Sequence, residues 1–279
     1  MNALALRSAD GTALAAQVFE PSAKPWAAVL LAPAMGVPAS YYTPFALWLS
    51  QQGVAVLSFD FRGIGASRFG RGLRGFGGDL DDWLQDQDAA LQALAKHCPG
   101  LPLVVIGHSL GAQLAAALPS RERLAGLLGV ALGSGYTGDL VPRFRPQARL
   151  FLYLVGPLAM ALAGYFPGKR LGIIGDVPLG AMKQWQRWCR TPGYLLAAEQ
   201  RHAHYKAARF PVVSLALADD EMLAANGQRM MFEAHGNPRH FETLQPAPGE
   251  RIGHTGLFKA RHRETHWPRL LHHLKELTT

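Results

Sequence analysis

Cysteine is scarce in this chain, which holds only Cys98 and Cys189 among its 279 residues. So few cysteines exclude a disulfide framework and a zinc site built from cysteine. The first residues, MNALALRSADGTALAAQ, also lack the basic stretch and the long apolar run of a secretory signal peptide. We therefore expect a cytoplasmic protein that is stabilised by a large core and not by cross-links.

Clustered basic charge and nucleotide-binding loops are also missing. The formal net charge is +8, but the lysines and arginines are scattered, so nucleic acid is not an expected partner. Gly63 and Gly65 do not form a dinucleotide fingerprint, because Arg68 stands where the third glycine is needed. A G-x-x-x-x-G-K-[ST] loop for phosphate does not occur either, and we expect no cofactor.

One long apolar run is present, LFLYLVGPLAMALAGYF at residues 150–166. Its length lies at the lower limit for a membrane-spanning helix, and Pro157 interrupts it. We predict an apolar helix that is buried in the fold or lines a pocket. Docking of this helix on a membrane surface is the alternative.

Short apolar segments alternate with helical patterns through most of the chain. Continuously apolar strands indicate a parallel sheet that is covered by helices on both faces. Two further strands are expected around an Asp10-Gly11 turn near the N-terminus. The other expected strands lie at 27–36, 54–63, 101–109, 124–135, 210–220 and 240–248. The expected helices lie at 41–53, 79–97, 110–120 and about 259–277.

The alternation of strands and helices stops after residue 135. The segment 136–209 shows no strand-like pattern, and several prolines separate its helical pieces. It is also rich in aromatic residues such as Trp185 and Trp188. We predict that this segment is a helical cap, inserted into a core domain that residues 1–135 and 210–279 form together.

The motif GHSLG at 107–111 follows a predicted strand and opens a predicted helix. In this setting G-x-S-x-G forms a sharp turn that lifts the serine clear of the sheet. The small residues Gly107 and Gly111 let the predicted strand and the predicted helix pass close to each other. Ser109 is then held at a helix N-terminus, where backbone N–H groups favour developing negative charge.

Together with GHSLG, two other motifs resemble those of the α/β-hydrolase family, namely DFRGIGAS at 60–67 and GHTGLF at 253–258. The resemblance covers nearly the whole chain and implies an α/β-hydrolase fold, with a mostly parallel sheet flanked by helices. PAMGVPASYY, QWQRWC and GHTGLF together resemble a subgroup of predicted serine hydrolases. Asp60, Arg62 and Ser67 are expected to brace the loop beside the active site and not to react.

The family places its triad in the chain order serine, acid, histidine, which implies a histidine base near the C-terminus. His254 suits this role because it stands in a glycine-containing loop after the last predicted strand. Four later histidines fall in the predicted terminal helix, where surface or packing roles are expected: His262, His266, His272 and His273. His262 and His266 have the i,i+4 spacing of zinc ligands, but no third ligand is evident, so we expect no metal.

The implied acid follows the strand before that histidine, where Asp219, Asp220 and Glu221 stand in a row. The family loop often carries the acid three residues after a glycine. This sequence has Leu217 at the glycine position, and the same offset selects Asp220. Asp219 and Glu221 remain alternatives, and the two unused acids are expected to be solvated or to cap the following helix.

An oxyanion hole needs two backbone N–H groups. The resemblance implies that Leu110, the residue after Ser109, provides one of them. The other is implied to come from Met35, in a loop where relatives often carry His-Gly and this chain has Pro33-Ala34. Three further residues are expected to line the pocket entrance: Pro38, Tyr41 and Tyr42.

We therefore predict a serine hydrolase that cleaves ester-type acyl bonds through an acyl-enzyme intermediate. The apolar cap favours a small-molecule ester with an apolar acyl group, so carboxylesterase is the leading activity. Acyl thioesterase, amidase or peptidase, acyltransferase and membrane-docked lipid hydrolase are alternatives. Epoxide hydrolase and dehalogenase chemistry is disfavoured, because those relatives use aspartate where Ser109 stands. The alternative from another class is a non-catalytic binding protein with the same fold.

Overall fold

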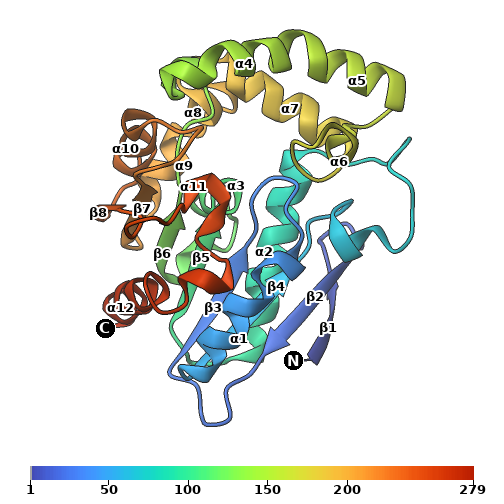
Figure 1. The fold of residues 1–279 in the computed structure, drawn as a ribbon. Coiled ribbons are helices and arrows are strands. Elements are labelled where there is room, and N and C mark those ends of the chain that lie inside the picture. The colour runs from blue at the N-terminus through green and yellow to red at the C-terminus, as the bar shows by residue number, and fades with distance from the viewer. Residues whose placement is uncertain (1) are drawn as a thin grey trace.

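The computed structural model describes residues 2–279. Its centre is an eight-stranded sheet with the order β1-β2-β4-β3-β5-β6-β7-β8 (Figure 1). β1 (Asn2–Arg7) and β2 (Ala13–Phe19) form an antiparallel edge, and β2 also pairs antiparallel with β4 (Val54–Phe59). The other strands run parallel to β4: β3 (Ala27–Ala32), β5 (Leu103–His108), β6 (Leu124–Val130), β7 (Val212–Leu217) and β8 (Pro238–Leu244). The predicted α/β class with a mostly parallel sheet is confirmed.

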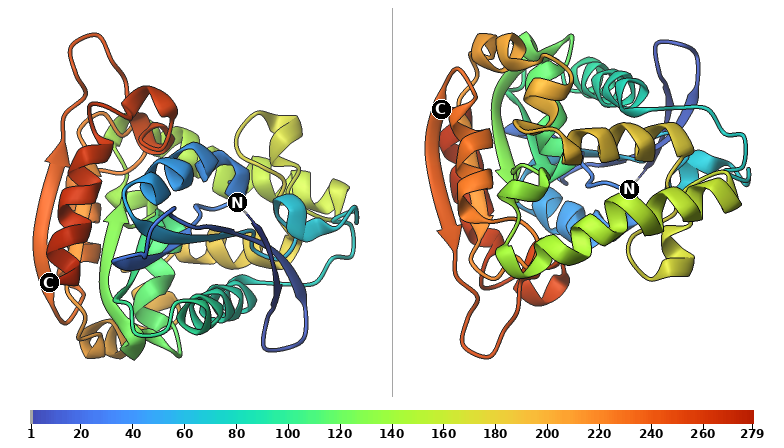
Figure 2. Two further views of the ribbon diagram at one scale, coloured as in Figure 1. Left: turned by 90° about the horizontal axis from the view of Figure 1, so that it is seen from below. Right: turned by 90° about the horizontal axis from the view of Figure 1, so that it is seen from above.

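Helices cover both faces of the sheet, because successive residues of a strand point to opposite sides. In β5, Leu103 and Val105 belong to one buried cluster, whereas Val104 and Ile106 belong to the other. The first cluster includes residues of α2 (Leu80–His97), α3 (Leu110–Leu114) and α10 (Ala225–Glu233), and the second includes residues of α1 (Thr43–Gln51) and α12 (Trp267–Thr278). Figure 2 shows these helices on the two sides of the sheet.

The terminal helix begins later than the sequence predicts. α12 begins at Trp267 and has a proline in its first turn, where the missing N–H of proline is tolerated. A separate 3₁₀ turn occupies Ala260–His262. His262 therefore lies outside the helix and His266 is its N-cap residue, which corrects the prediction that both lie within it.

The chain between β6 and β7, all of which the structure describes, is helical and contributes no strand to the sheet. It contains α4 (Arg145–Leu150), a π-helical turn (Phe151–Val155), α5 (Gly156–Ala163), α6 (Gly168–Leu171), α7 (Leu179–Arg190), α8 (Tyr194–Ala198) and α9 (His202–Ala207). In Figure 1, α4, α5 and α7 lie across one end of the sheet. Gln184 Oε1 on α7 accepts a hydrogen bond from the Leu80 N–H of α2 at 2.7 Å, which connects this helical segment to a helix that packs on the sheet. The division at residues 136–209 stays a prediction.

The apolar run at 150–166 is not buried, contrary to the prediction. Four leucines that recur every four residues are more than half exposed: Leu150, Leu154, Leu158 and Leu162. This spacing keeps their side chains on one helix face, which points away from the core, while Leu152 and Met160 point inward and are buried. The continuous helical run Pro142–Ala163 has 22 residues, and its most apolar 18-residue window has a mean hydropathy of 1.2 and is 22% buried. By length and composition this run is a candidate membrane span.

Candidate active site

Ser109 occupies a strained turn between β5 and α3. Its φ of 50° and ψ of −112° lie in a region that residues other than glycine rarely adopt. A Cβ atom at Gly107 would lie 2.5 Å from the Ala112 Cα atom, and one at Gly111 would lie 2.4 Å from the Ala32 carbonyl oxygen. The turn therefore depends on the absence of a side chain at both positions.

The close approach of Gly111 to Ala32 places the N-terminus of α3 against the loop after β3. Leu110 is the first residue of α3 and Met35 lies in that loop, and both are buried. The first N–H groups of a helix have no acceptor within the helix. The two predicted oxyanion donors thus belong to segments that meet beside Ser109.

His254 lies in the short helix α11 (Gly253–Gly256) and is buried. Its Nε2 atom is 3.3 Å from Ser109 Oγ, and its Nδ1 atom is 2.8 Å from Asp220 Oδ2. Because Nδ1–H donates to the carboxylate, Nε2 of the neutral ring is left free to accept from the serine hydroxyl. The structure therefore joins three residues that are far apart in the sequence into one hydrogen-bonded chain.

The pair of Asp220 and His254 is shielded from solvent, with side-chain exposures of 1% and 9%. Burial acts to raise the pKa of Asp220, but the charge and hydrogen bond of His254 and the amides of Leu223 and Met222 lower it below its ordinary value. Burial acts to lower the pKa of His254, but Asp220, helped by the charge of Glu221, raises it above 6.5. The ionised aspartate therefore stabilises the imidazolium that forms when His254 accepts a proton.

Asp220 is fixed by the turn in which it stands. Its Oδ1 atom accepts from the amides of Met222 and Leu223 at 2.8 and 2.9 Å, which leaves Oδ2 for His254. The carboxylate is thus held in one orientation without help from its neighbours in the acidic row. Of the three adjacent acids, Asp220 is the one whose side chain reaches the imidazole of His254.

Asp219 and Glu221 hold the backbone of the segment that carries His254. The Asp219 carboxylate accepts from the amides of Ile252 and Gly253 at 2.8 and 3.0 Å. Glu221 Oε2 accepts from the amide of His254 at 3.0 Å. Neither acid caps the following helix, which corrects that part of the prediction, whereas the Glu221 side chain is 39% exposed and so remains partly solvated. No local pattern in the sequence indicates these backbone partners.

A buried chain of polar groups connects the loop after β3 with His254. The Ala34 N–H donates to the Tyr42 hydroxyl at 3.0 Å, and this hydroxyl donates to His108 Nδ1 at 2.8 Å. His108 Nε2–H donates to the His254 carbonyl oxygen at 2.9 Å. Burial, followed by the charge of His254, lowers the pKa of His108 to about 3, so the ring stays neutral. Tyr42 is therefore buried and does not line a pocket entrance, which corrects the prediction.

Replacing Tyr42 by phenylalanine is expected to lower both stability and turnover. The change leaves two buried polar groups without their partner, and each such group costs about 1–3 kcal/mol. Because the chain of hydrogen bonds positions both the predicted oxyanion loop after β3 and His254, we expect kcat/KM for a nitrophenyl ester to fall roughly tenfold. Tyr205→Phe is the matched control, since it removes a buried hydroxyl that donates to the Gln113 carbonyl oxygen. The control should lower Tm and keep kcat/KM, and a Tyr42→Phe variant with normal kcat/KM would contradict the prediction.

The DFRGIGAS turn makes structural hydrogen bonds, as predicted. Asp60 accepts from the amides of Ala39 and Ala66 at 2.6 and 2.8 Å, and Ser67 Oγ donates to the Asp60 carbonyl oxygen at 2.7 Å. Arg62 pairs with three carboxylates: Asp10, Asp82 and Asp86. The Ala15 N–H of β2 also donates to Ser67 Oγ at 2.8 Å, so the turn is held against both β2 and α2.

A groove of about 410 Å³ lies between the core and the predicted cap. Its walls include Gly36 and Val37 from the loop after β3 and Ile174 from the segment after α6. Gly36 directly follows Met35, so the groove begins at the predicted oxyanion loop. Another cavity, of about 320 Å³, lies at the N-terminal ends of the strands, away from the carboxyl ends where open α/β sheets bind ligands.

A model of the family described as serine aminopeptidase, S33 matches residues 23–165, just over half of the chain. The chain belongs to this family of α/β-hydrolases. Among solved structures, this α/β-hydrolase is similar to a soluble variant of monoglyceride lipase from Saccharomyces cerevisiae in complex with a substrate analogue. The TM-score is 0.74 at 17% identity, with 100% of this chain and 96% of that chain covered.

The α/β-hydrolase is also similar to a thermostable carboxyl esterase from Bacillus coagulans, with a TM-score of 0.71, 14% identity and coverage of 100% and 99% of the two chains. An esterase from Pyrococcus furiosus matches with a TM-score of 0.62, 16% identity and coverage of 100% and 91%. At such low identities these matches show that the fold is shared.

Proposed function

We propose that this α/β-hydrolase cleaves ester-type acyl bonds, with Ser109 as nucleophile, His254 as general base and Asp220 as the acid that orients it. The observation that carries the proposal is the chain of contacts, 3.3 Å from Ser109 Oγ to His254 and 2.8 Å from His254 to Asp220. The serine end of this chain stands in a strained turn. A protein that only binds ligands has no need to hold a serine in a costly backbone conformation against a buried imidazole.

The proposed reaction begins when Ser109 Oγ attacks the ester carbonyl and His254 Nε2 takes the hydroxyl proton. The amides of Met35 and Leu110 donate to the oxyanion that forms. His254 then gives its proton to the departing alcohol, which leaves an acyl group on Ser109. Water attacks this acyl group, His254 takes the proton of the water, and the acid is released with Ser109 restored.

An apolar acyl ester is the substrate class that the surroundings favour. The groove next to the oxyanion loop carries Val37, Ile64 and Ile174. Two similar structures are described as a monoglyceride lipase and a carboxyl esterase, which supports ester chemistry. An acyl thioester reacts by the same steps, and Lys169 in the groove lining suits the anionic part of an acyl-CoA, whereas Arg68 lies 3.6 Å from the carboxylate of Asp176. Acyl thioesterase is therefore the alternative within this class.

A fluorophosphonate probe and a matched substrate panel test the proposal. We expect one probe adduct per chain, mapped to Ser109, and complete loss of hydrolysis in the labelled protein. Nitrophenyl esters and acyl-CoAs with the same series of acyl chains then separate the esterase from the thioesterase by kcat/KM. An adduct on a different residue, or a folded protein that hydrolyses neither series, would contradict the proposal.

The pH dependence of kcat/KM is expected to follow the protonation of His254. The base works only when neutral, so activity is present above the pKa of His254 and is lost as pH falls through it. Burial opposes the charged form, but Asp220 and Glu221 raise this pKa, so the midpoint should lie above 6.5. Glu221→Gln should move the midpoint to lower pH, whereas Glu264→Gln, at an exposed site, should leave it in place. A wild-type midpoint below 6.5, measured from pH 5 to 9, would contradict this prediction.

The exposed leucine face supports a second candidate function, the hydrolysis of lipids at a membrane surface. A helix that lies in the membrane interface needs an apolar face and nearby basic residues that attract anionic headgroups. The leucines at 150, 154, 158 and 162 provide the apolar face, and Arg149, Lys169 and Arg170 are exposed beside them in the sequence. The similar yeast structure is described as a soluble variant of its lipase.

Replacing Leu154 and Leu158 together by serine tests membrane docking. We expect binding to vesicles that contain anionic phospholipid to weaken by at least about tenfold, because each buried methylene group contributes about 0.8 kcal/mol. Hydrolysis of a soluble short-chain ester should stay unchanged. Leu47→Ser is the matched control, since Leu47 is an exposed leucine on α1. Flotation assays in which the double variant binds like the wild type would exclude this face as the docking site.

A further inference from the structure

Two histidines and a glutamate converge where the segment after β8 meets the start of α12. Glu250 precedes α11, His262 ends the 3₁₀ turn, and His266 is the N-cap residue of α12. Glu250 Oε2 is 3.5 Å from His262 Nδ1. One ligand atom from each of the three side chains lies within 4.8 Å of the other two. The side chains therefore share one small volume, although Glu250 is twelve residues away from His262.

The polar atoms that meet in this cluster have no hydrogen-bond partner among residues 2–279. Glu250 Oε2, His262 Nδ1 and His266 Nε2 are all buried and make no hydrogen bond, although the first two atoms lie 3.5 Å apart. Buried polar atoms are normally hydrogen-bonded, because an unpaired one loses its hydration without compensation. Three such atoms in one place indicate a common partner that satisfies them together.

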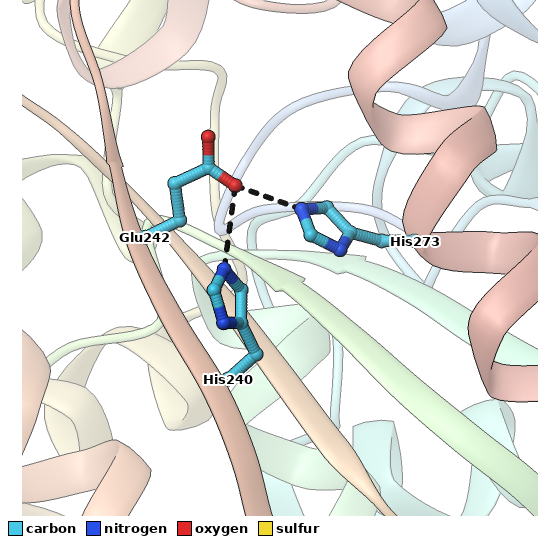
Figure 3. Close-up of side chains that lie close together, drawn as sticks. All are labelled: His240, Glu242 and His273. Carbon is cyan, nitrogen blue, oxygen red and sulfur yellow. Dashed lines mark hydrogen bonds and ion pairs between the residues drawn. The ribbon is translucent and has the colours of Figure 1, made fainter.

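A second cluster of the same composition provides a contrast (Figure 3). Glu242 accepts from His273 Nε2 at 2.8 Å and lies 3.6 Å from His240 Nε2. Both oxygens of Glu242 also accept from Arg269 Nε, and His273 Nδ1 is 2.9 Å from Glu276. The central carboxylate and imidazole are thus already paired with protein groups, one of which is a cation. This cluster fastens α12 to β8 and has no need of another partner.

We propose that Glu250, His262 and His266 bind a divalent transition-metal ion, for which zinc is the best fit. Two imidazole nitrogens and one carboxylate oxygen form a His₂Glu donor set that zinc accepts in tetrahedral geometry. Bonds of about 2.1 Å at tetrahedral angles place two donor atoms roughly 3.4 Å apart. The 3.5 Å between Glu250 Oε2 and His262 Nδ1 already matches this spacing. The fourth position is left for a water molecule.

The ring of His262 can present its Nδ1 atom to a metal ion if one neighbouring side chain moves. Arg261 Nε donates to His262 Nε2 at 3.1 Å, which places the ring proton on Nδ1. Binding at Nδ1 moves that proton to Nε2 and requires Arg261 to turn away, which its exposed position allows.

The ion would join the two sides of the segment that carries His254. Glu250 lies four residues before His254, and His262 lies eight residues after it. A metal that binds both closes this loop and restricts its unfolding, so binding should raise the thermal midpoint. Metal binding itself does not depend on the proposed function, and its readouts below are independent of catalysis.

The test uses the full chain, stripped of metal with a chelator, dialysed and titrated with zinc chloride. We expect one zinc ion per chain by calorimetry and by elemental analysis after gel filtration, together with a higher Tm. Glu250→Gln and His266→Ala should each weaken zinc binding by about 100-fold or more. Loss of a group that only hydrogen-bonds to a metal ligand already weakens binding by about 10- to 100-fold in other proteins. They should also remove the zinc-dependent part of Tm. Circular dichroism and the Tm in the absence of zinc show whether each variant is folded.

Two control variants separate this site from other histidines. His240→Ala combined with His272→Ala removes exposed imidazoles from the remaining His/Glu clusters and should leave the zinc stoichiometry and affinity unchanged. Arg261→Gln removes the competing donor and should bind zinc at least as tightly as the wild type. Wild-type protein that takes up no stoichiometric zinc would overturn the proposal and point to a bridging water. Equal binding by wild type, Glu250→Gln and His266→Ala, or loss of binding in the histidine double variant, would also overturn it.

Discussion

Ser109→Ala is expected to lower kcat for a nitrophenyl ester by roughly a millionfold, the scale seen when a serine protease loses its nucleophile. The variant keeps the groove and the proposed backbone donors but lacks the atom that attacks the carbonyl in the proposed reaction. His254 Nε2, at 3.3 Å from the serine oxygen, then has no hydroxyl to activate. KM should change little, because the hydroxyl contributes little to binding of the intact ester. The measurement is steady-state hydrolysis with an active-site titration of the wild type.

The control for this loss is Ser40→Ala, at an exposed serine in the 3₁₀ turn Ala39–Tyr42 after the oxyanion loop. It changes the same chemical group close to the site and should keep wild-type kcat and KM. In Ser109→Ala the strained turn can relax only if the backbone shifts. If it does not shift, Tm should stay close to that of the wild type, and if it does, Tm should rise. A Ser109→Ala protein that retains more than about a thousandth of wild-type kcat would assign the nucleophile to another residue.

The strands and helices of the core could be predicted because their signals are local. Short apolar runs such as 27–36 and 101–109, bounded by proline or glycine, indicate buried parallel strands, and the glycines of GHSLG mark a turn that only small residues permit. The start of α12 could not be placed, because the helical pattern continues upstream of Trp267 and the break comes from a turn at 260–262. The spacing of apolar residues shows which side chains share a face of a helix, but it does not show whether protein or solvent lies against that face. The apolar pattern of 150–166 therefore predicts a helix that is buried or lines a pocket, although four of its five leucines, Leu150, Leu154, Leu158 and Leu162, are more than half exposed.

The site shows the same division between local and distant information. The family motifs select Ser109 and His254 and narrow the acid to three neighbours. What decides between those neighbours is distant: the turn after Asp220 aims Oδ2 at a histidine 34 residues away, and Asp219 and Glu221 bind the backbone beside it. Tyr42 and Glu250 are further cases. Each is an ordinary residue in its own segment and becomes informative only when the fold brings its partner close.

The acidic row provides the second prediction with a large expected effect. Asp220→Asn should lower kcat by about 10⁴, by analogy with triad aspartates elsewhere, because an amide presents the wrong partner to Nδ1 and favours the wrong imidazole tautomer. Its loss also removes the main group that raises the pKa of His254, so the remaining activity should persist to lower pH than in the wild type. This shift distinguishes loss of the triad acid from a general disturbance of the loop.

The neighbouring acids are the matched controls for Asp220→Asn, because each change replaces a carboxylate by an amide of the same size. Asp219→Asn and Glu221→Gln each weaken contacts to backbone amides of the histidine segment, so they should lower Tm and reduce kcat by no more than about tenfold. A loss of about a thousandfold in Asp219→Asn, with near-normal turnover in Asp220→Asn, would show that the assignment of Asp220 is wrong and that Asp219 is the triad acid. The predicted order of effects follows from one geometric fact, namely that only Asp220 of the three contacts the imidazole, whereas the other two contact the backbone that carries it.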